Sequence, residues 1–87
     1  TLKLHLESQF PNLPGATWET YGLNGWEIDH RKPCNAFDLS DPAQQLACFH
    51  YTNLQPMWSG DNQSKSDTFD EATFTHTWTG KEWVLKT

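Results

Sequence analysis

The stretch Trp26-Glu27-Ile28-Asp29-His30-Arg31-Lys32-Pro33 decides how the rest of this 87-residue chain is interpreted. Its apolar residues Trp26 and Ile28 alternate with acidic ones, which is the period of a half-buried β-strand. The strand should end before Pro33, because proline cannot donate a hydrogen bond to a ladder. Asp29 and His30 therefore fall together at a strand end, where a carboxylate can hold a metal ion and an imidazole can move a proton.

Length and composition indicate a single α+β domain covering residues 1–87, since a chain of this size has no room for a second core. The hydrophobic fraction is only 36%, but five Trp, five Phe and two Tyr supply bulky anchors. No apolar run is long enough for a transmembrane helix, and no basic-then-apolar segment suggests a signal peptide. The first residue is Thr1 rather than Met, which suggests a piece of a longer protein.

The net charge of −5 argues against a protein that holds nucleic acid by bulk electrostatics alone. Arg31, Lys32 and Lys65 nevertheless lie in the segments that carry the candidate site. Acidic residues such as Asp38 and Asp70 could face away from a substrate.

Two cysteines, Cys34 and Cys48, limit the metal and disulfide chemistry. They could form one disulfide, but they cannot supply a four-cysteine zinc site. We expect two free, partly buried thiols in a reducing compartment and no structural zinc. A Cys/His zinc site that includes His50 is the alternative, although its spacing matches no standard pattern.

The flanking sequence predicts short elements around the central strand. They are an amphipathic helix over 2–10, a helical turn over 17–22, a turn at 24–25, a helix over 41–49, an extended piece over 51–55 that ends at Pro56, a helix over 57–65 and a β-hairpin over about 72–87. The helix over 57–65 is weak by propensity, because it contains Ser59, Gly60 and Ser64. The predicted core consists of Trp26, Ile28, Phe37, Phe49, Leu54 and Trp58. His76, in the hairpin, is predicted to be a surface or packing residue.

Two asparagines supply candidate partners for Asp29 and His30. Asn53 lies in the extended piece over 51–55, and Asn62 lies in the weak helix nine residues later. If the two extended segments pair and the helix crosses them, these four side chains converge in one strand–strand–helix unit.

Four ordered segments resemble the HNH endonuclease family, and in particular the phage- and intron-associated members of the Asp-His…Asn…Asn type. The segments are WEIDHRKP (26–33), AFDLS (36–40), CFHYTNLQPMW (48–58) and DNQSKSD (61–67). The resemblance covers about residues 17–68 and does not extend into the C-terminal hairpin.

That resemblance implies a ββα-metal core (the HNH or His-Me finger) and a DNA phosphodiesterase that uses one divalent ion, Mg²⁺ or Mn²⁺. Asp29 and Asn62 would bind the metal through hard oxygen atoms. His30 would be the general base that takes a proton from water. Asn53 would orient the His30 ring by a hydrogen bond.

The resemblance also implies DNA as the partner and a cytoplasmic location in a bacterial or phage-infected cell. Lys65, Arg31 and Lys32 would contact phosphates. Further domains or a partner protein would supply the DNA affinity that an acidic chain lacks.

Each candidate residue also has a plainer explanation. Asp29 could cap a turn, His30 could be a core histidine, and Asn53, Asn62 and Lys65 could be turn or surface residues. For the whole chain the alternative is a catalytically silent HNH-like module that binds DNA or a protein partner. A third hypothesis is an inhibitor or adaptor that acts through the aromatic hairpin. The complete Asp/His/Asn/Asn set favours the enzyme.

Overall fold

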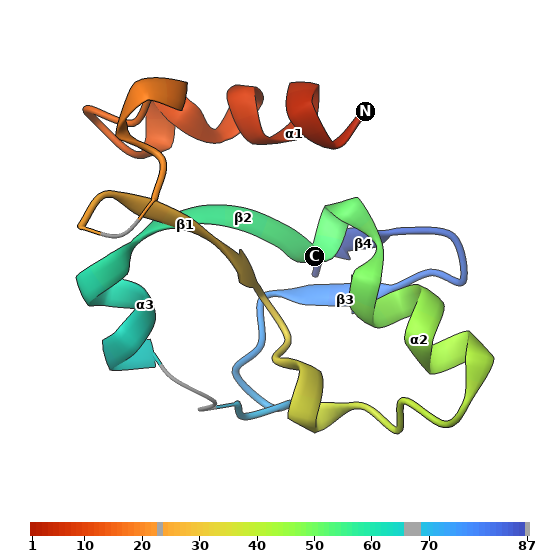
Figure 1. The fold of residues 1–87 in the computed structure, drawn as a ribbon. Helices are drawn as coiled ribbons and strands as arrows, with labels where there is room; N and C mark the ends of the chain where they lie inside the picture. The colour runs from red at the N-terminus through yellow and green to blue at the C-terminus, as the bar shows by residue number, and fades with distance from the viewer. Residues whose placement is uncertain (23, 66–68, 87) are drawn as a thin grey trace.

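The computed structural model describes residues 1–22, 24–65 and 69–86, and these form an α+β fold with two small antiparallel sheets, as the sequence predicts at the level of fold class (Figure 1). The helices are α1 (Leu2–Gln9), α2 (Pro42–Phe49) and α3 (Ser59–Lys65). The strands are β1 (Trp26–His30), β2 (Leu54–Trp58), β3 (His76–Trp78) and β4 (Trp83–Leu85). Single 3₁₀ turns η1 (Phe10–Asn12), η2 (Trp18–Thr20), η3 (Cys34–Ala36) and η4 (Tyr51–Asn53) lie between them.

A two-stranded ribbon of β1 and β2 lies at the centre of the molecule. The strands are antiparallel, with Trp26 opposite Trp58 and His30 opposite Leu54. Helix α1 packs against β2, and α3 contacts both strands from the other side of the ribbon (Figure 1). The predicted pairing of the two extended segments is confirmed, and β1 ends at His30 as expected.

The boundaries around Pro56 differ from the prediction. Residues 51–53 form η4, while Pro56 and Met57 belong to β2, so that α3 begins only at Ser59. Pro56 lies opposite Ile28 in a sheet of two strands. Each strand of such a sheet is an edge, and an edge strand tolerates a residue that lacks a backbone N–H.

The main core is built on Trp26, whose side chain is fully buried. Its indole N–H donates to the Thr17 carbonyl oxygen at 2.6 Å, and the Phe10 ring lies edge-on at 5.3 Å between centroids. Leu6 of α1 is also buried, and Ile28 and Trp58 pack on the same cluster. These contacts join α1 to one face of the central ribbon.

Phe49 is not the core residue that the pattern predicts, because 57% of it is exposed. Helix α2 instead turns Ala47 and Cys48 inward. The indole N–H of Trp83 donates to the Ala47 carbonyl oxygen at 2.7 Å, and so close an approach leaves room only for small side chains. Phe37 is half-buried against the Trp83 ring.

The predicted C-terminal hairpin is confirmed, with β3 and β4 antiparallel. Trp83 is buried, and its backbone N–H donates to Thr52 Oγ1 at 2.7 Å. His76 is half-buried and lies 2.8 Å from the Thr75 hydroxyl through Nδ1. Trp83 thus fastens the hairpin to α2 and η4, which leaves little for an adaptor surface built on that residue.

None of the helices formed by the described residues has the length and apolar character needed to cross a membrane.

Gly25 provides a test of how the turn before β1 is packed. A Cβ at Gly25 would lie 1.7 Å from the Thr20 carbonyl oxygen, whereas a Cβ at Gly60 in α3 would meet no atom within 4 Å. We expect Gly25→Ala to lower the free energy of unfolding by more than about 2 kcal/mol, because the backbone must move. Gly60→Ala should raise it by about 0.5 kcal/mol through helix propensity. Urea unfolding followed by circular dichroism measures both, and equal stability of the two variants would contradict the packing of this turn.

Candidate metal and catalytic site

The end of β1 and the half-buried face of α3 enclose an open pocket of about 220 Å³. Asp29 and His30 contribute the last two side chains of β1, and Asn62 and Lys65 come from α3. Cys34 lines the same pocket. The structure therefore brings together three of the four residues of the predicted catalytic set, and it adds a cysteine.

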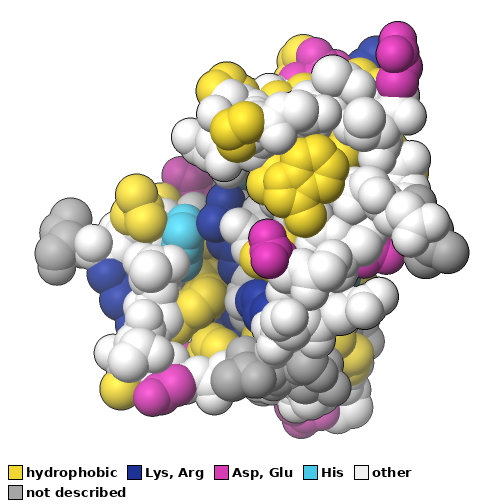
Figure 2. Space-filling model, turned by 90° about the vertical axis from the view of Figure 1, so that its left-hand side faces the viewer, with side chains coloured by type: hydrophobic (Ala, Val, Ile, Leu, Met, Phe, Trp, Pro, Cys, Tyr) yellow, Lys and Arg dark blue, Asp and Glu magenta, His cyan; other side chains and the backbone are white. Residues whose placement is uncertain are grey.

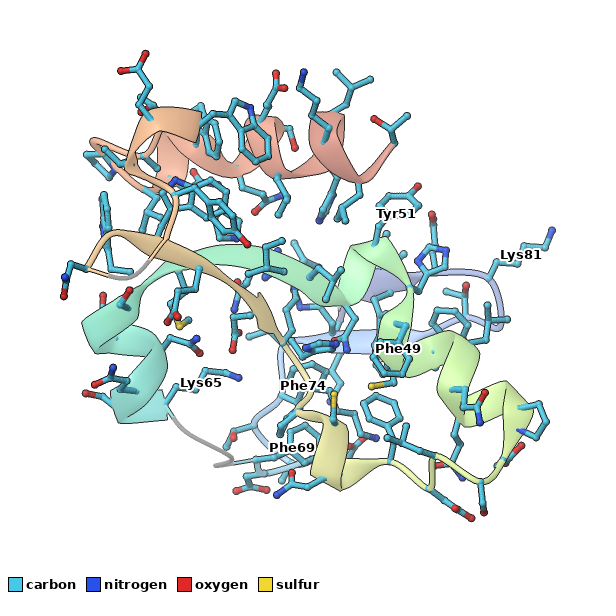
Figure 3. All side chains as sticks on the ribbon, in the orientation of Figure 1. Phe49, Tyr51, Lys65, Phe69, Phe74 and Lys81 are labelled. Atoms are coloured by element: carbon cyan, nitrogen blue, oxygen red, sulfur yellow. The ribbon has the colours of Figure 1, made fainter. Side chains whose placement is uncertain are left out.

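Asp29 is a buried carboxylate that is already paired. Only 6% of it is exposed; Lys65 Nζ lies 3.2 Å from Oδ1, and Gln55 Nε2 donates to Oδ2 at 2.9 Å. Lys65 also donates to the His30 carbonyl oxygen at 2.9 Å, and Figure 3 shows its side chain reaching from α3 towards β1. The charge of Asp29 is thus balanced by a cation that joins the helix to the strand end.

Asn62 is oriented by Glu27, a residue that the sequence argument did not select. Asn62 Nδ2 donates to Glu27 Oε1 at 3.3 Å. Within the described residues the amide oxygen of Asn62 accepts no hydrogen bond, which leaves it free for another ligand. The available signal was the two-residue spacing of Glu27 and Asp29, which puts both on the same face of a strand.

The donor set suits a hard divalent ion. A carboxylate and an amide oxygen are typical ligands of Mg²⁺ and Mn²⁺. Each carboxylate oxygen has two lone pairs, so Asp29 can accept a further ligand beyond Gln55 and Lys65. The Lys65 ammonium beside Oδ1 shows that this position attracts positive charge. A metal would share Oδ1 with Lys65 or displace it.

His30 favours the neutral form of its imidazole, and one of its ring nitrogens is buried without a hydrogen-bond partner among the described residues. Burial lowers the pKa of His30; Asp29 opposes that shift, and Lys65 adds to it. Nε2 is buried and has no hydrogen-bond partner among the described residues. The ring meets the Phe49 ring edge-on at 5.6 Å between centroids. A neutral ring with a free nitrogen can accept a proton or bind a metal.

Asn53 does not make the predicted hydrogen bond to His30. Its fully buried carboxamide is used by backbone groups: Oδ1 accepts from Lys32 N at 2.9 Å, and Nδ2 donates to the carbonyl oxygens of Lys32 at 3.1 Å and Cys48 at 2.9 Å. Asn53 therefore fastens the segment after β1 to the end of α2. Any influence on His30 passes through the backbone.

The other predicted phosphate contacts are engaged inside the protein. Lys32 Nζ lies 4.7 Å from the Phe37 ring centroid and 5.1 Å from that of Phe69, and it pairs with Glu71 at 3.8 Å. Two aromatic rings and one carboxylate therefore surround the Lys32 ammonium in cation–π and ionic contacts, which have a structural role.

Arg31 donates to Gln55 Oε1 at 2.9 Å and to Gln9 Oε1 at 3.3 Å. It lines a larger pocket of about 350 Å³ together with Lys65, Phe69 and Phe74. Phe69 and Phe74 lie close together on the segment that follows α3 (Figure 3). Figure 2 shows one face of the molecule with a hollow, in which Lys or Arg side chains and a histidine lie beside apolar side chains.

The two cysteines lie next to each other, with 3.4 Å between their Sγ atoms, and both are free. Burial and the neighbouring Cys34 raise the pKa of Cys48 to about 12. The histidine beside them is His30 rather than the predicted His50. His50 Nδ1 instead lies 2.8 Å from the Thr52 hydroxyl.

Asn53→Ala tests the role of the buried carboxamide. The substitution removes the partners of three backbone groups, and we expect the free energy of unfolding to fall by about 2–4 kcal/mol. Asn35→Ala, at an exposed position in η3, should change it by no more than about 0.5 kcal/mol. Urea unfolding measures both free energies. An Asn53→Ala protein as stable as Asn35→Ala would show that the hydrogen bonds of the Asn53 carboxamide do not hold these segments together.

Comparison with known proteins finds sequences similar to this chain in a virus. The chain is 38% identical over 65 residues to uncharacterized protein L246 and 36% identical over 62 residues to uncharacterized protein L426, both of Acanthamoeba polyphaga mimivirus. The matches cover 75% and 71% of this chain but 27% and 26% of those proteins. The chain thus spans about a quarter of the length of these curated relatives. No family model and no solved structure matches the chain.

Proposed function

We propose that this chain is an HNH-type endonuclease domain that hydrolyses DNA phosphodiester bonds with one divalent metal ion. The observation that carries the proposal is the convergence of Asp29, His30 and Asn62 on one pocket. That pocket is bounded by an antiparallel pair of strands and the helix that follows them. A strand–strand–helix unit with these side chains supports a ββα-metal interpretation of the core.

Asp29 and Asn62 are the metal-binding residues in this proposal. Both offer oxygen atoms to the pocket, and Glu27 and Gln55 hold them in place through hydrogen bonds. A divalent ion bound there would stabilise the negative charge that builds on the phosphate and on the leaving oxygen.

His30 is the general base. The lowered pKa of His30 keeps its ring neutral at neutral pH, as a base that takes a proton from water requires. Nε2 is buried and has no hydrogen-bond partner among the described residues, so the ring would have to turn towards the pocket to meet that water. The peptide group that follows His30 is fixed at both ends, because Lys65 donates to its carbonyl oxygen and its N–H, from Arg31, donates to the Asn53 carbonyl oxygen at 2.7 Å. Asn53 is a positioning residue that acts through this backbone.

DNA affinity is the weak part of an isolated domain with net charge −5. Of the three predicted phosphate contacts, Lys65 lies in the pocket beside the proposed metal ligands and remains the best placed. The longer protein of which such a domain is a part would supply the remaining contacts, since the chain matches only 27% of protein L246.

One observation favours the alternative, a catalytically silent module that binds DNA or a protein partner. The Asp29–Lys65 ion pair places a resident cation on the proposed metal ligand. In a silent module this pair would be permanent and would serve only to join α3 to β1.

Cleavage of supercoiled plasmid DNA separates the two candidates. With Mg²⁺ or Mn²⁺ the protein should nick or linearise the plasmid, and EDTA should abolish this. His30→Ala should lower the rate by about 10²–10⁴-fold, the usual contribution of a general base. His76→Ala, which changes a histidine of the hairpin, is the matched control and should retain the rate. If the protein leaves the plasmid as intact as His30→Ala does, across metals and salt concentrations, the nuclease proposal fails.

Asn62→Ala tests the metal ligand separately. Loss of one neutral oxygen ligand should raise the metal concentration needed for half-maximal cleavage by about tenfold or more, and excess metal should restore part of the rate. Gln63→Ala, at the neighbouring exposed position of α3, should leave the metal dependence unchanged. An Asn62→Ala protein with the normal metal dependence would remove Asn62 from the metal shell.

A further inference from the structure

His30, Cys34 and Cys48 form a second group of ligands beside the proposed catalytic site, which we call the thiol–histidine cluster. Their ligand atoms all lie within 4.8 Å of one another, and the two sulfurs are 3.4 Å apart. We propose that the thiol–histidine cluster binds a soft or borderline divalent ion, Zn²⁺ above all, and thereby takes His30 away from catalysis.

The chemistry of the three ligands selects the metal. Thiolate and imidazole ligands favour Zn²⁺, whereas Mg²⁺ and Mn²⁺ prefer oxygen. Zinc–sulfur bonds of about 2.3 Å in a tetrahedral site place two sulfurs about 3.8 Å apart. The two sulfurs of the cluster, at 3.4 Å, are close to this separation, and all three ligand atoms lie within 4.8 Å of one another. Small side-chain rotations would therefore complete the site. Solvent from the pocket would fill the fourth position.

The backbone that carries the ligands is held together before any metal binds. His30 ends β1, Cys34 begins η3, and Cys48 lies in α2. The carboxamide of Asn53 bonds both Lys32, between the first two ligands, and the carbonyl oxygen of Cys48 itself. The ligands thus come from three elements that a buried side chain keeps in place, which lowers the cost of assembling a site.

The surroundings are also those of a metal site. Cys48 is fully buried, His30 and Cys34 are half-buried, and the Phe49 ring covers one side of His30. Nε2 of His30 is buried and lacks a hydrogen-bond partner among the residues that the structure describes. A disulfide between the cysteines would use both sulfurs but would leave this nitrogen unexplained.

Zinc binding and general-base catalysis exclude each other at His30, because the lone pair that binds a metal cannot accept a proton. Cys34 and His30 line the pocket that also contains Asp29 and Asn62, so the two metal positions share one histidine. This inhibitory consequence rests on the proposed nuclease function. The binding of zinc does not.

The binding test uses the whole chain with reduced thiols, titrated with Co²⁺ and then with Zn²⁺. One equivalent of Co²⁺ should produce a thiolate-to-cobalt charge-transfer band, and Zn²⁺ should abolish it and protect both cysteines from alkylation. Cys34→Ser and His30→Gln should each weaken zinc binding by at least about a hundredfold, since loss of even an outer partner costs 10–100-fold. His76→Gln is the matched control and should bind normally. Cys34 is the preferred cysteine for substitution because it is only half-buried, and circular dichroism verifies that each variant is folded.

Absence of the charge-transfer band would overturn the site, and so would folded Cys34→Ser and His30→Gln proteins that bind zinc as tightly as the unmodified protein. Isolation of a Cys34–Cys48 disulfide whose reduced form binds no zinc would also overturn it.

The inhibition test measures plasmid cleavage in Mg²⁺ with added Zn²⁺, relative to the zinc-free rate of each protein. Zinc should inhibit the unmodified protein at the concentration that fills the cluster, and Cys34→Ser should resist it. Equal inhibition of both proteins would refute the sharing of His30. If neither protein cleaves DNA, the proposed function fails, while the zinc site still stands or falls by the cobalt titration.

Discussion

The buried carboxamide of Asn53 is the interaction on which the site depends. It pairs with both backbone groups of Lys32 and with the carbonyl oxygen of Cys48, so one side chain joins the exit of β1 to the end of α2. Unpaired groups at such a buried position are costly, which makes the arrangement nearly obligatory once the chain has folded this way. The positions of His30 and Cys34 follow from it, because they lie on either side of the fastened segment.

The second constraint is the ion pair between Asp29 and Lys65, which attaches α3 to the central ribbon. A buried pair is weak evidence for net stability, since desolvation of both charges offsets most of their attraction. Its effect is on geometry: Lys65 also bonds the His30 carbonyl oxygen, so the end of α3 is set against the end of β1. Asn62, one turn earlier on α3, is thereby held over the pocket.

The sequence pattern predicted those parts of the site that depend only on residues close together in the chain. The alternation around Trp26 and the stop at Pro33 predicted β1 and the adjacent pair at its end, and both are observed. The inward face of α2 could not be predicted in the same way, because Trp83, 36 residues after Ala47, determines it. The predicted partner of Asn53 was wrong, since its carboxamide bonds backbone groups that no residue pattern reveals. Glu27 was overlooked although its spacing from Asp29 was visible.

The two proposed metal-ligand sets differ chemically and share one residue. The carboxylate of Asp29 and the amide oxygen of Asn62 line the pocket, whereas the two thiols come from η3 and α2, and His30 belongs to both groups. Hard and soft ions prefer opposite sets, so competition would arise at the imidazole alone. An imidazole that is neutral and lacks a hydrogen-bond partner at Nε2 among the described residues can be recruited by either set. The usual carboxylate or carbonyl partner of a metal-bound or catalytic histidine bonds the ring nitrogen that does not bind the metal or take the proton. In both proposals the ligand or base is a nitrogen with a free lone pair, and a neutral imidazole has only one such nitrogen, so His30 could serve one ligand set at a time.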